Sequence, residues 1–163
     1  MPVCEIVSCT PTGMTFTIAV AIVSHEDEDP YTWILQQLQH LLGSKVSEVI
    51  LTDRELGLIK ALGVVFPHVH HSLCWVHILR KCEHHAFEKT KSEVIKDSFR
   101  ADCTSLINSC LEESYESRRG YLFHKWPALM SYVQRVWLTP YKRKIVRFWT
   151  DRVFHLGNRT TNM

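Results

Sequence analysis

Patterns typical of β-strands occur only in the first half of the chain, and this limits the fold more than any other feature. Residues 3–9 form a short apolar run, a Thr-Pro-Thr-Gly turn follows, and apolar residues then alternate with period two over 14–22. Such alternation around a turn is typical of a β-hairpin. From about residue 88 onward no strand pattern recurs. The order of patterns therefore predicts a mixed α/β region followed by helices.

Helix and strand patterns alternate between the hairpin and residue 88. Apolar residues recur at helical spacing over 31–42, after Pro30 and before Gly43, and predict a helix that ends at the glycine. The next elements are predicted to be a strand at 48–52, a helix at 56–65, a strand at 68–73 and a helix from about residue 75.

The acidic run at 26–29 precedes the first predicted helix. Four carboxylates in a row could in principle bind a divalent cation. Their place just before a helix favours capping and compensation of the helix dipole instead.

An apolar stripe marks the predicted helical region. Its members recur at helical spacing and predict a core-facing surface rather than a cofactor site. Pro140 is predicted to interrupt this stripe, and a further helix is predicted to open at Tyr141. The stripe consists of Trp126, Leu129, Met130, Val133, Val136 and Trp137.

Composition places the chain among globular proteins. Its 163 residues are 45% hydrophobic and 22% charged, which suits one domain with a real core. No apolar run approaches the roughly 18 residues that cross a bilayer. The opening MPVCEIVSC has no basic region before an apolar stretch, so we expect no secretory signal and a reducing compartment. The six cysteines are irregularly spaced and are predicted to be free thiols.

Charge is distributed unevenly along the chain. Residues 1–50 hold six acids and one base, whereas residues 118–163 hold ten bases and one acid. The C-terminal third is therefore a candidate surface for a polyanion, with a solvated helical face as the alternative. The residues assigned to this surface are Lys142, Arg143, Lys144, Arg147 and Arg152.

Asp53 closes the predicted strand 48–52. The C-terminal end of a buried strand in an open α/β sheet is where ligands and metals bind, so this carboxylate is a candidate site residue. The alternative is a helix N-cap, because Arg, Glu and Leu suit the first turn of a following helix.

Cys74 and His77 lie three residues apart, a spacing that puts both on one face of a helix. A zinc ion would need two more ligands, and the spacing matches no standard zinc finger. Packing with hydrogen-bonded histidines is favoured over structural zinc, and a Cys/His nucleophile pair is favoured still less. No glycine-rich phosphate loop occurs. The further zinc candidates are His70, His71, Cys82, His84 and His85.

Five stretches in order resemble the transposase domain of Mutator-like elements, the MULE family, which is also the parent of the plant far-red-response transcription factors. They are residues 1–38, 49–67, 71–82, 137–151 and 155–163, with VILTDREL and HSLCWVHILRKC among them. The resemblance implies a ribonuclease H-like fold and metal-dependent cutting and joining of DNA. It implies DNA and other transposase chains as partners, a nuclear location, and neither a membrane nor a small-molecule cofactor.

In that family an Asp, Asp and Glu triad holds two Mg²⁺ or Mn²⁺ ions. The resemblance makes Asp53 the second acid and a metal ligand, and makes Cys74 and His77 the Cys-x-x-His signature. The first Asp and the Glu are expected outside this sequence.

The resemblance also implies an organisation. Residues 1–87 would be a ribonuclease H-like core whose mixed sheet lacks its first strand. Residues 88–150 would be an all-helical insertion, and 151–163 would lead to the missing Glu. The leading hypothesis is a catalytically incomplete transposase fragment. The alternatives are a domesticated DNA-binding or regulatory module and a remnant without function.

Overall fold

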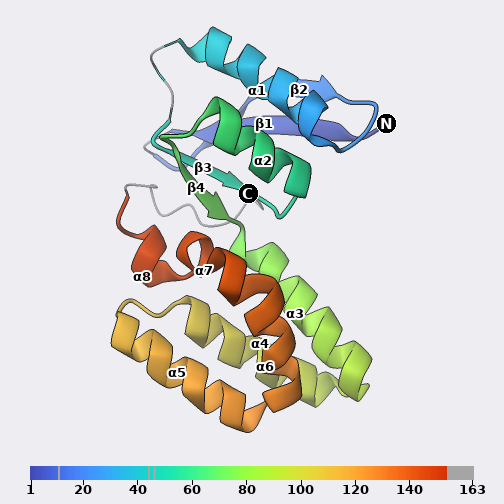
Figure 1. Ribbon diagram of the computed structural model, residues 1–163, viewed down its shortest axis with the longest axis vertical. Helices are drawn as coiled ribbons and strands as arrows, with labels where there is room; N and C mark the ends of the chain where they lie inside the picture. The colour runs from blue at the N-terminus through green and yellow to red at the C-terminus, as the bar shows by residue number, and fades with distance from the viewer. Residues whose placement is uncertain (11, 44, 46, 154–163) are drawn as a thin grey trace.

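The computed structural model describes residues 1–10, 12–43, 45 and 47–153. These residues form an α/β unit over 3–73 and a helical unit over 75–150, which lie one below the other in Figure 1. The α/β unit contains β1 (Val3–Cys9), β2 (Thr15–Ile22), α1 (Glu28–Leu42), β3 (Val49–Thr52), α2 (Leu56–Val65) and β4 (His70–Leu73). The helical unit contains α3 (Trp75–Thr90), α4 (Glu93–Ile107), α5 (Glu112–Lys125), α6 (Pro127–Val133), the π-helix η1 (Gln134–Leu138), α7 (Thr139–Ile145) and α8 (Arg147–Thr150).

The predicted hairpin is confirmed. β1 pairs antiparallel with β2, and the register shifts between Ile6 and Val7. One face of the hairpin packs Cys4, Ile6 and Ala21 against the core formed with α1 and α2. The other face stays exposed, although it carries most of the large apolar side chains of the hairpin. These exposed side chains are Val3, Val7, Phe16, Ile18, Val20 and Ile22.

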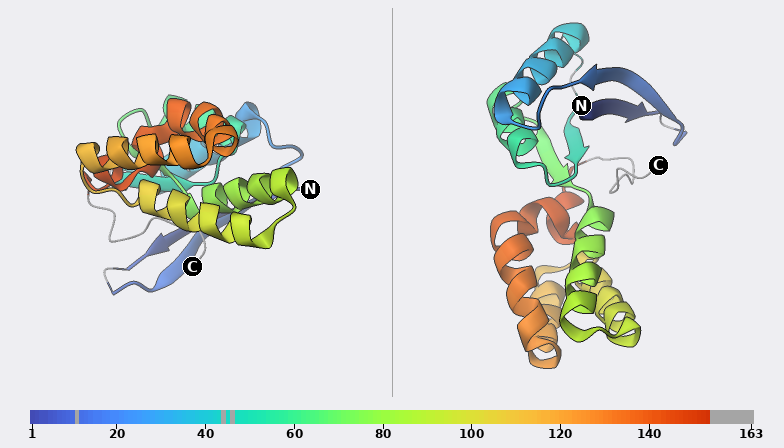
Figure 2. Two further views of the ribbon diagram at one scale, coloured as in Figure 1. Left: turned by 90° about the horizontal axis from the view of Figure 1, so that it is seen from below. Right: turned by 90° about the vertical axis from the view of Figure 1, so that its right-hand side faces the viewer.

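The predicted strand–helix–strand unit is also confirmed. β3 pairs parallel with β4, and α2 connects them. Among the described strands the sheets are two separate pairs, β1–β2 and β3–β4, rather than one mixed sheet. The chain is therefore mixed α/β with small sheets and mostly helices (Figure 2).

Helix α1 begins at Glu28, slightly before the predicted start at Pro30. Glu28 and Asp29 lie in its first turn, where carboxylates stabilise the positive end of the helix dipole. Asp27 occupies the N-cap position without a side-chain cap, and its carboxylate instead lies 3.6 Å from Nε2 of His25. The acidic run thus compensates the dipole, while the expected side-chain capping is not made by Asp27.

The apolar stripe packs in the core of the helical unit, as predicted. Leu129, Met130, Val133 and Trp137 are buried, and the side chains of α3 and α4 complete the same core. Aromatic rings tie the end of the unit to α5, since Trp149 packs edge-on against Tyr115 with ring centroids 5.2 Å apart.

The predicted helix break at Pro140 is wrong. The chain remains helical from η1 into α7, and the break comes at Val146, where ψ is 133°. Proline lacks the N–H that an α-helix needs and crowds the preceding turn. Here a π-helical turn precedes it, and Pro140 lies in the first turn of α7, where that N–H is not required.

All six cysteines are free thiols, as the sequence predicts. None of the described helices combines the length and the apolar character that crossing a bilayer requires.

Candidate functional site at the end of strand β3

Asp53 follows the last residue of β3 and is exposed. The N-cap of α2 is Glu55, whose carboxylate accepts a hydrogen bond of 3.1 Å from the backbone N–H of Gly57. Glu55 rather than Asp53 therefore caps helix α2. Among the described residues no side chain forms an ion pair with the Asp53 carboxylate.

A chain of three hydrogen bonds fixes the backbone of Asp53. The Lys144 ammonium donates to Nδ1 of His71 across 2.9 Å. Because ammonium is only a donor, Nδ1 is the acceptor, and the ring proton is left on Nε2. Nε2–H then donates to the Thr52 hydroxyl across 2.8 Å, and that hydroxyl donates to the Asp53 carbonyl across 2.7 Å. A helix of the helical unit thereby holds the end of β3.

The electrostatics agree with a neutral imidazole in this chain. Burial, followed by the neighbouring charges of Lys144 and His70, lowers the pKa of His71 to about 3. Burial also lowers the pKa of the Lys144 amine. A neutral His71 imidazole at neutral pH is thus consistent with one ring nitrogen that accepts and one that donates.

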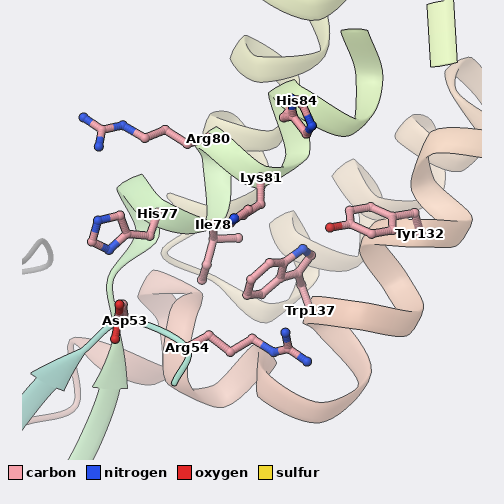
Figure 3. A pocket seen from close by; sticks show the side chains of 9 residues that line it. All are labelled: Asp53, Arg54, His77, Ile78, Arg80, Lys81, His84, Tyr132 and Trp137. Atoms are coloured by element: carbon pink, nitrogen blue, oxygen red, sulfur yellow. The ribbon is translucent and has the colours of Figure 1, made fainter. Parts of the chain in front are cut away.

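A cavity of about 750 Å³ opens between the end of β3 and the helical unit. Figure 3 shows Asp53 and His77 at one side of it and the aromatic rings of Tyr132 and Trp137 at the other. Its wall consists of Asp53, Arg54, His77, Ile78, Arg80, Lys81, His84, Tyr132 and Trp137.

Arg54 links the strand end to the helical unit. Its guanidinium carbon lies 5.2 Å from the centroid of Trp137 and 5.6 Å from that of Tyr141. Cations at such distances are attracted to the face of an aromatic ring. The indole N–H of Trp137 is buried without a hydrogen-bond partner in the part of the chain that the structure describes.

Four basic side chains line the cavity from α3, and we call them the α3 basic stripe. They are His77, Arg80, Lys81 and His84, at positions i, i+3, i+4 and i+7 of one helix. This spacing puts them on one face, opposite the buried Leu79 and the rest of the core. Sequence reasoning missed the stripe, although the spacing was visible in HILRKCEH.

Cys74 and His77 have different surroundings. Cys74 is buried at the N-cap of α3, and its backbone N–H donates to the Thr52 carbonyl across 2.7 Å. His77 lines the cavity. Of the further zinc candidates, His71 is hydrogen-bonded as described, and His85 stacks on Tyr132 with centroids 3.9 Å apart.

The described residues do not by themselves fit a metal centre. No three histidine, cysteine, aspartate or glutamate side chains among them are placed to share a metal ion. A two-metal site of the kind implied by the resemblance needs carboxylates from several elements. Among the described residues that line the cavity at the end of β3, Asp53 is the one carboxylate.

The basic residues predicted to bind DNA lie on α7 and α8 or directly after α8. The Lys142 amine lies 5.1 Å from the Trp149 ring centroid, and the Arg152 guanidinium lies 4.6 Å from that of Phe148. Arg147 pairs with Asp151 at 2.6 Å, and Lys144 is half-buried against His71. Arg143 is exposed on α7.

Comparison with known proteins gives a consistent result. The family model described as the MULE transposase domain matches residues 1–81. The chain is 26% identical over 142 residues to Protein FAR1-RELATED SEQUENCE 5 of Arabidopsis thaliana, and 20% identical over 147 residues to Protein FAR-RED IMPAIRED RESPONSE 1 of the same plant. These alignments cover 80% and 88% of this chain but 17% of each relative. The chain thus spans about a sixth of the length of these curated relatives.

Proposed function

Residues 1–81 belong to the MULE transposase domain family, so the chain is transposase-derived, and we propose that it supplies one acid, Asp53, to a DDE-type DNA transposition site. The observation that carries the proposal is the position of Asp53. Its carboxylate is exposed at the C-terminal end of β3, beside a cavity, and forms no ion pair with a described residue.

The proposal includes a ribonuclease H-like fold for the α/β unit. The parallel β3–α2–β4 unit with its acid at the strand end supports it, since ligands of open α/β sheets bind at that edge. The antiparallel hairpin β1–β2 supports it as well.

The chain by itself is proposed to bind DNA without cutting it. The family chemistry needs two divalent cations held by carboxylates of several elements, and one carboxylate, that of Asp53, lines the cavity in the described residues. The same proposal includes Mg²⁺ or Mn²⁺ as the cofactor, further transposase chains as partners and a nuclear location.

The test is DNA cleavage by the purified chain in Mg²⁺ or Mn²⁺, with Asp53→Ala as the matched control. We expect no cleavage that depends on Asp53. Cleavage that the wild-type chain performs and Asp53→Ala loses would overturn the proposed incompleteness. Equal cleavage by both would indicate a contaminating nuclease.

A second candidate function is a DNA-binding or regulatory module that uses the basic residues of the last helices. The excess of bases over residues 118–163 and the exposure of Arg143 favour it. Duplex binding should then weaken steeply with salt, and charge reversal at Lys142 and Arg143 should weaken it for every sequence. Lys144 is left unchanged in this test because it holds His71. Binding that ignores salt would contradict the candidate.

A further inference from the structure

The cavity beside Asp53 is lined by more positive than negative side chains. Three of its lining residues carry permanent positive charge, Arg54, Arg80 and Lys81, against the single carboxylate of Asp53. His77 and His84 add two imidazoles. An anionic ligand would therefore be attracted to this wall.

The cations of the stripe are not engaged elsewhere. Within the described residues neither Arg80 nor Lys81 forms an ion pair. Exposed cations of neighbouring surfaces do, since Arg100 pairs with Glu83 at 2.6 Å and Lys91 pairs with Glu88 at 2.7 Å. Arg80 and Lys81 thus present their charges, without an ion-pair partner among the described residues, on the face that lines the cavity.

The opposite wall is aromatic, with the buried Trp137 ring lying under the Arg54 guanidinium. Tyr132 and Trp137 come from the helical unit and face the stripe across the cavity in Figure 3. From His77 to His84 the helix rises about 10 Å, which equals about three base-pair steps of 3.4 Å along the axis of a duplex.

We propose that the α3 basic stripe binds the phosphodiester backbone of duplex DNA and leads it along the cavity to Asp53. The choice of DNA over other polyanions rests on the proposed function. The binding of phosphate groups is inferred from the positively charged residues that line the cavity. The stripe is a different surface from the basic residues of the last helices, so the two assignments can be separated by mutation.

The main experiment measures the affinity of the whole chain for a labelled DNA duplex by fluorescence anisotropy over a series of salt concentrations, with EDTA present. The variant Arg80→Ala/Lys81→Ala should bind roughly 30-fold more weakly at 0.15 M salt, and the slope of log K against log salt should fall by about 1.8, as two lost phosphate contacts require. Both side chains are exposed, so circular dichroism and the melting temperature should stay unchanged.

Three further variants sharpen the result. Lys89→Ala removes an exposed cation from the same helix outside the cavity, and it should bind DNA like the wild type. Asp53→Asn removes the one negative charge of the wall, and it should bind DNA a few-fold more tightly. Lys142→Ala/Arg143→Ala reports on the rival surface and should have the smaller effect.

The proposal is overturned if Arg80→Ala/Lys81→Ala binds DNA like Lys89→Ala, or if inorganic phosphate at low concentration competes as well as duplex DNA. Tighter binding of an RNA duplex of the same sequence would overturn the choice of DNA. The cleavage assay is separate from these affinity measurements. If the proposed transposase role failed, the affinities would still show whether the α3 basic stripe binds DNA.

Discussion

Lys144 and His71 lie 73 positions apart in the chain, and the Lys144 ammonium donates a 2.9 Å hydrogen bond to the His71 imidazole. The bond joins α7 to β4, and through Thr52 it reaches the backbone of Asp53. A residue that the sequence assigned to a DNA surface therefore has a second task inside the fold. It fixes the helical unit against the strand end that carries the candidate acid.

Acid should destabilise the fold through His71. Its pKa is about 3 in the folded chain against 6.5 ordinarily, so below pH 6.5 the unfolded chain binds a proton that the folded chain does not. The stabilisation is complete above pH 6.5 and is lost as pH falls towards 3, by up to about 1.4 kcal/mol for each pH unit. Urea unfolding at several pH values measures this. His71→Gln should flatten the dependence, and an unchanged pH profile in that variant would contradict the assignment.

Arg54 and Trp137 should be energetically coupled. The guanidinium lies 5.2 Å from the indole centroid, and exposed cation–π pairs contribute about 0.5–1 kcal/mol. A double-mutant cycle with Arg54→Ala and Trp137→Phe should give a coupling free energy at the low end of this range, because Phe keeps a weaker ring. The single change Trp137→Phe also removes a buried N–H without a partner, which offsets part of the lost packing. Strictly additive effects would mean that the two side chains do not interact in solution.

Two glycines of α2 should respond oppositely to alanine. A Cβ at Gly57 would lie 2.7 Å from the backbone carbon of Asp27, so Gly57→Ala should cost about 1–3 kcal/mol through overpacking. A Cβ at Gly63 meets no described atom within 4 Å, and Gly63→Ala should stabilise the helix by about 1 kcal/mol. Thermal melting of the two variants tests this. Equal shifts would argue against the close approach of α2 to the chain before α1.

The cysteines should differ sharply in reactivity. Cys110 is exposed, whereas Cys74, Cys82 and Cys103 are buried. The hydrogen bond shared with Cys82, and then burial, raises the pKa of Cys103, which disfavours the reactive thiolate. Iodoacetamide labelling followed by mass spectrometry should find Cys110 first, with the three buried thiols protected until urea unfolds the chain. Fast labelling of Cys82 or Cys103 in the native chain would show that α3 and α4 open readily.

Local patterns predicted the elements well. The alternation over 14–22 became β2, the apolar run before Asp53 became β3, and the stripe from Trp126 to Trp137 became core. Each of these depends on side-chain periodicity within one segment, which the sequence displays directly. The break assigned to Pro140 failed because a π-helical turn accommodated the proline, and that turn is stabilised by packing against other helices.

By itself the sequence determined the strand and helix order, the acid at the end of β3 and the resemblance to MULE transposases, because these depend on neighbours along the chain and on motif order. Only the tertiary structure decided that Glu55 rather than Asp53 caps α2, that Lys144 holds His71, and that His77, Arg80, Lys81 and His84 face Tyr132 and Trp137 across one cavity. The physical reason is that hydrogen bonds, burial and electrostatic fields act between atoms close in space. Apart from the local cap at Glu55, the partners of these side chains come from other helices and strands, and packing brings them together.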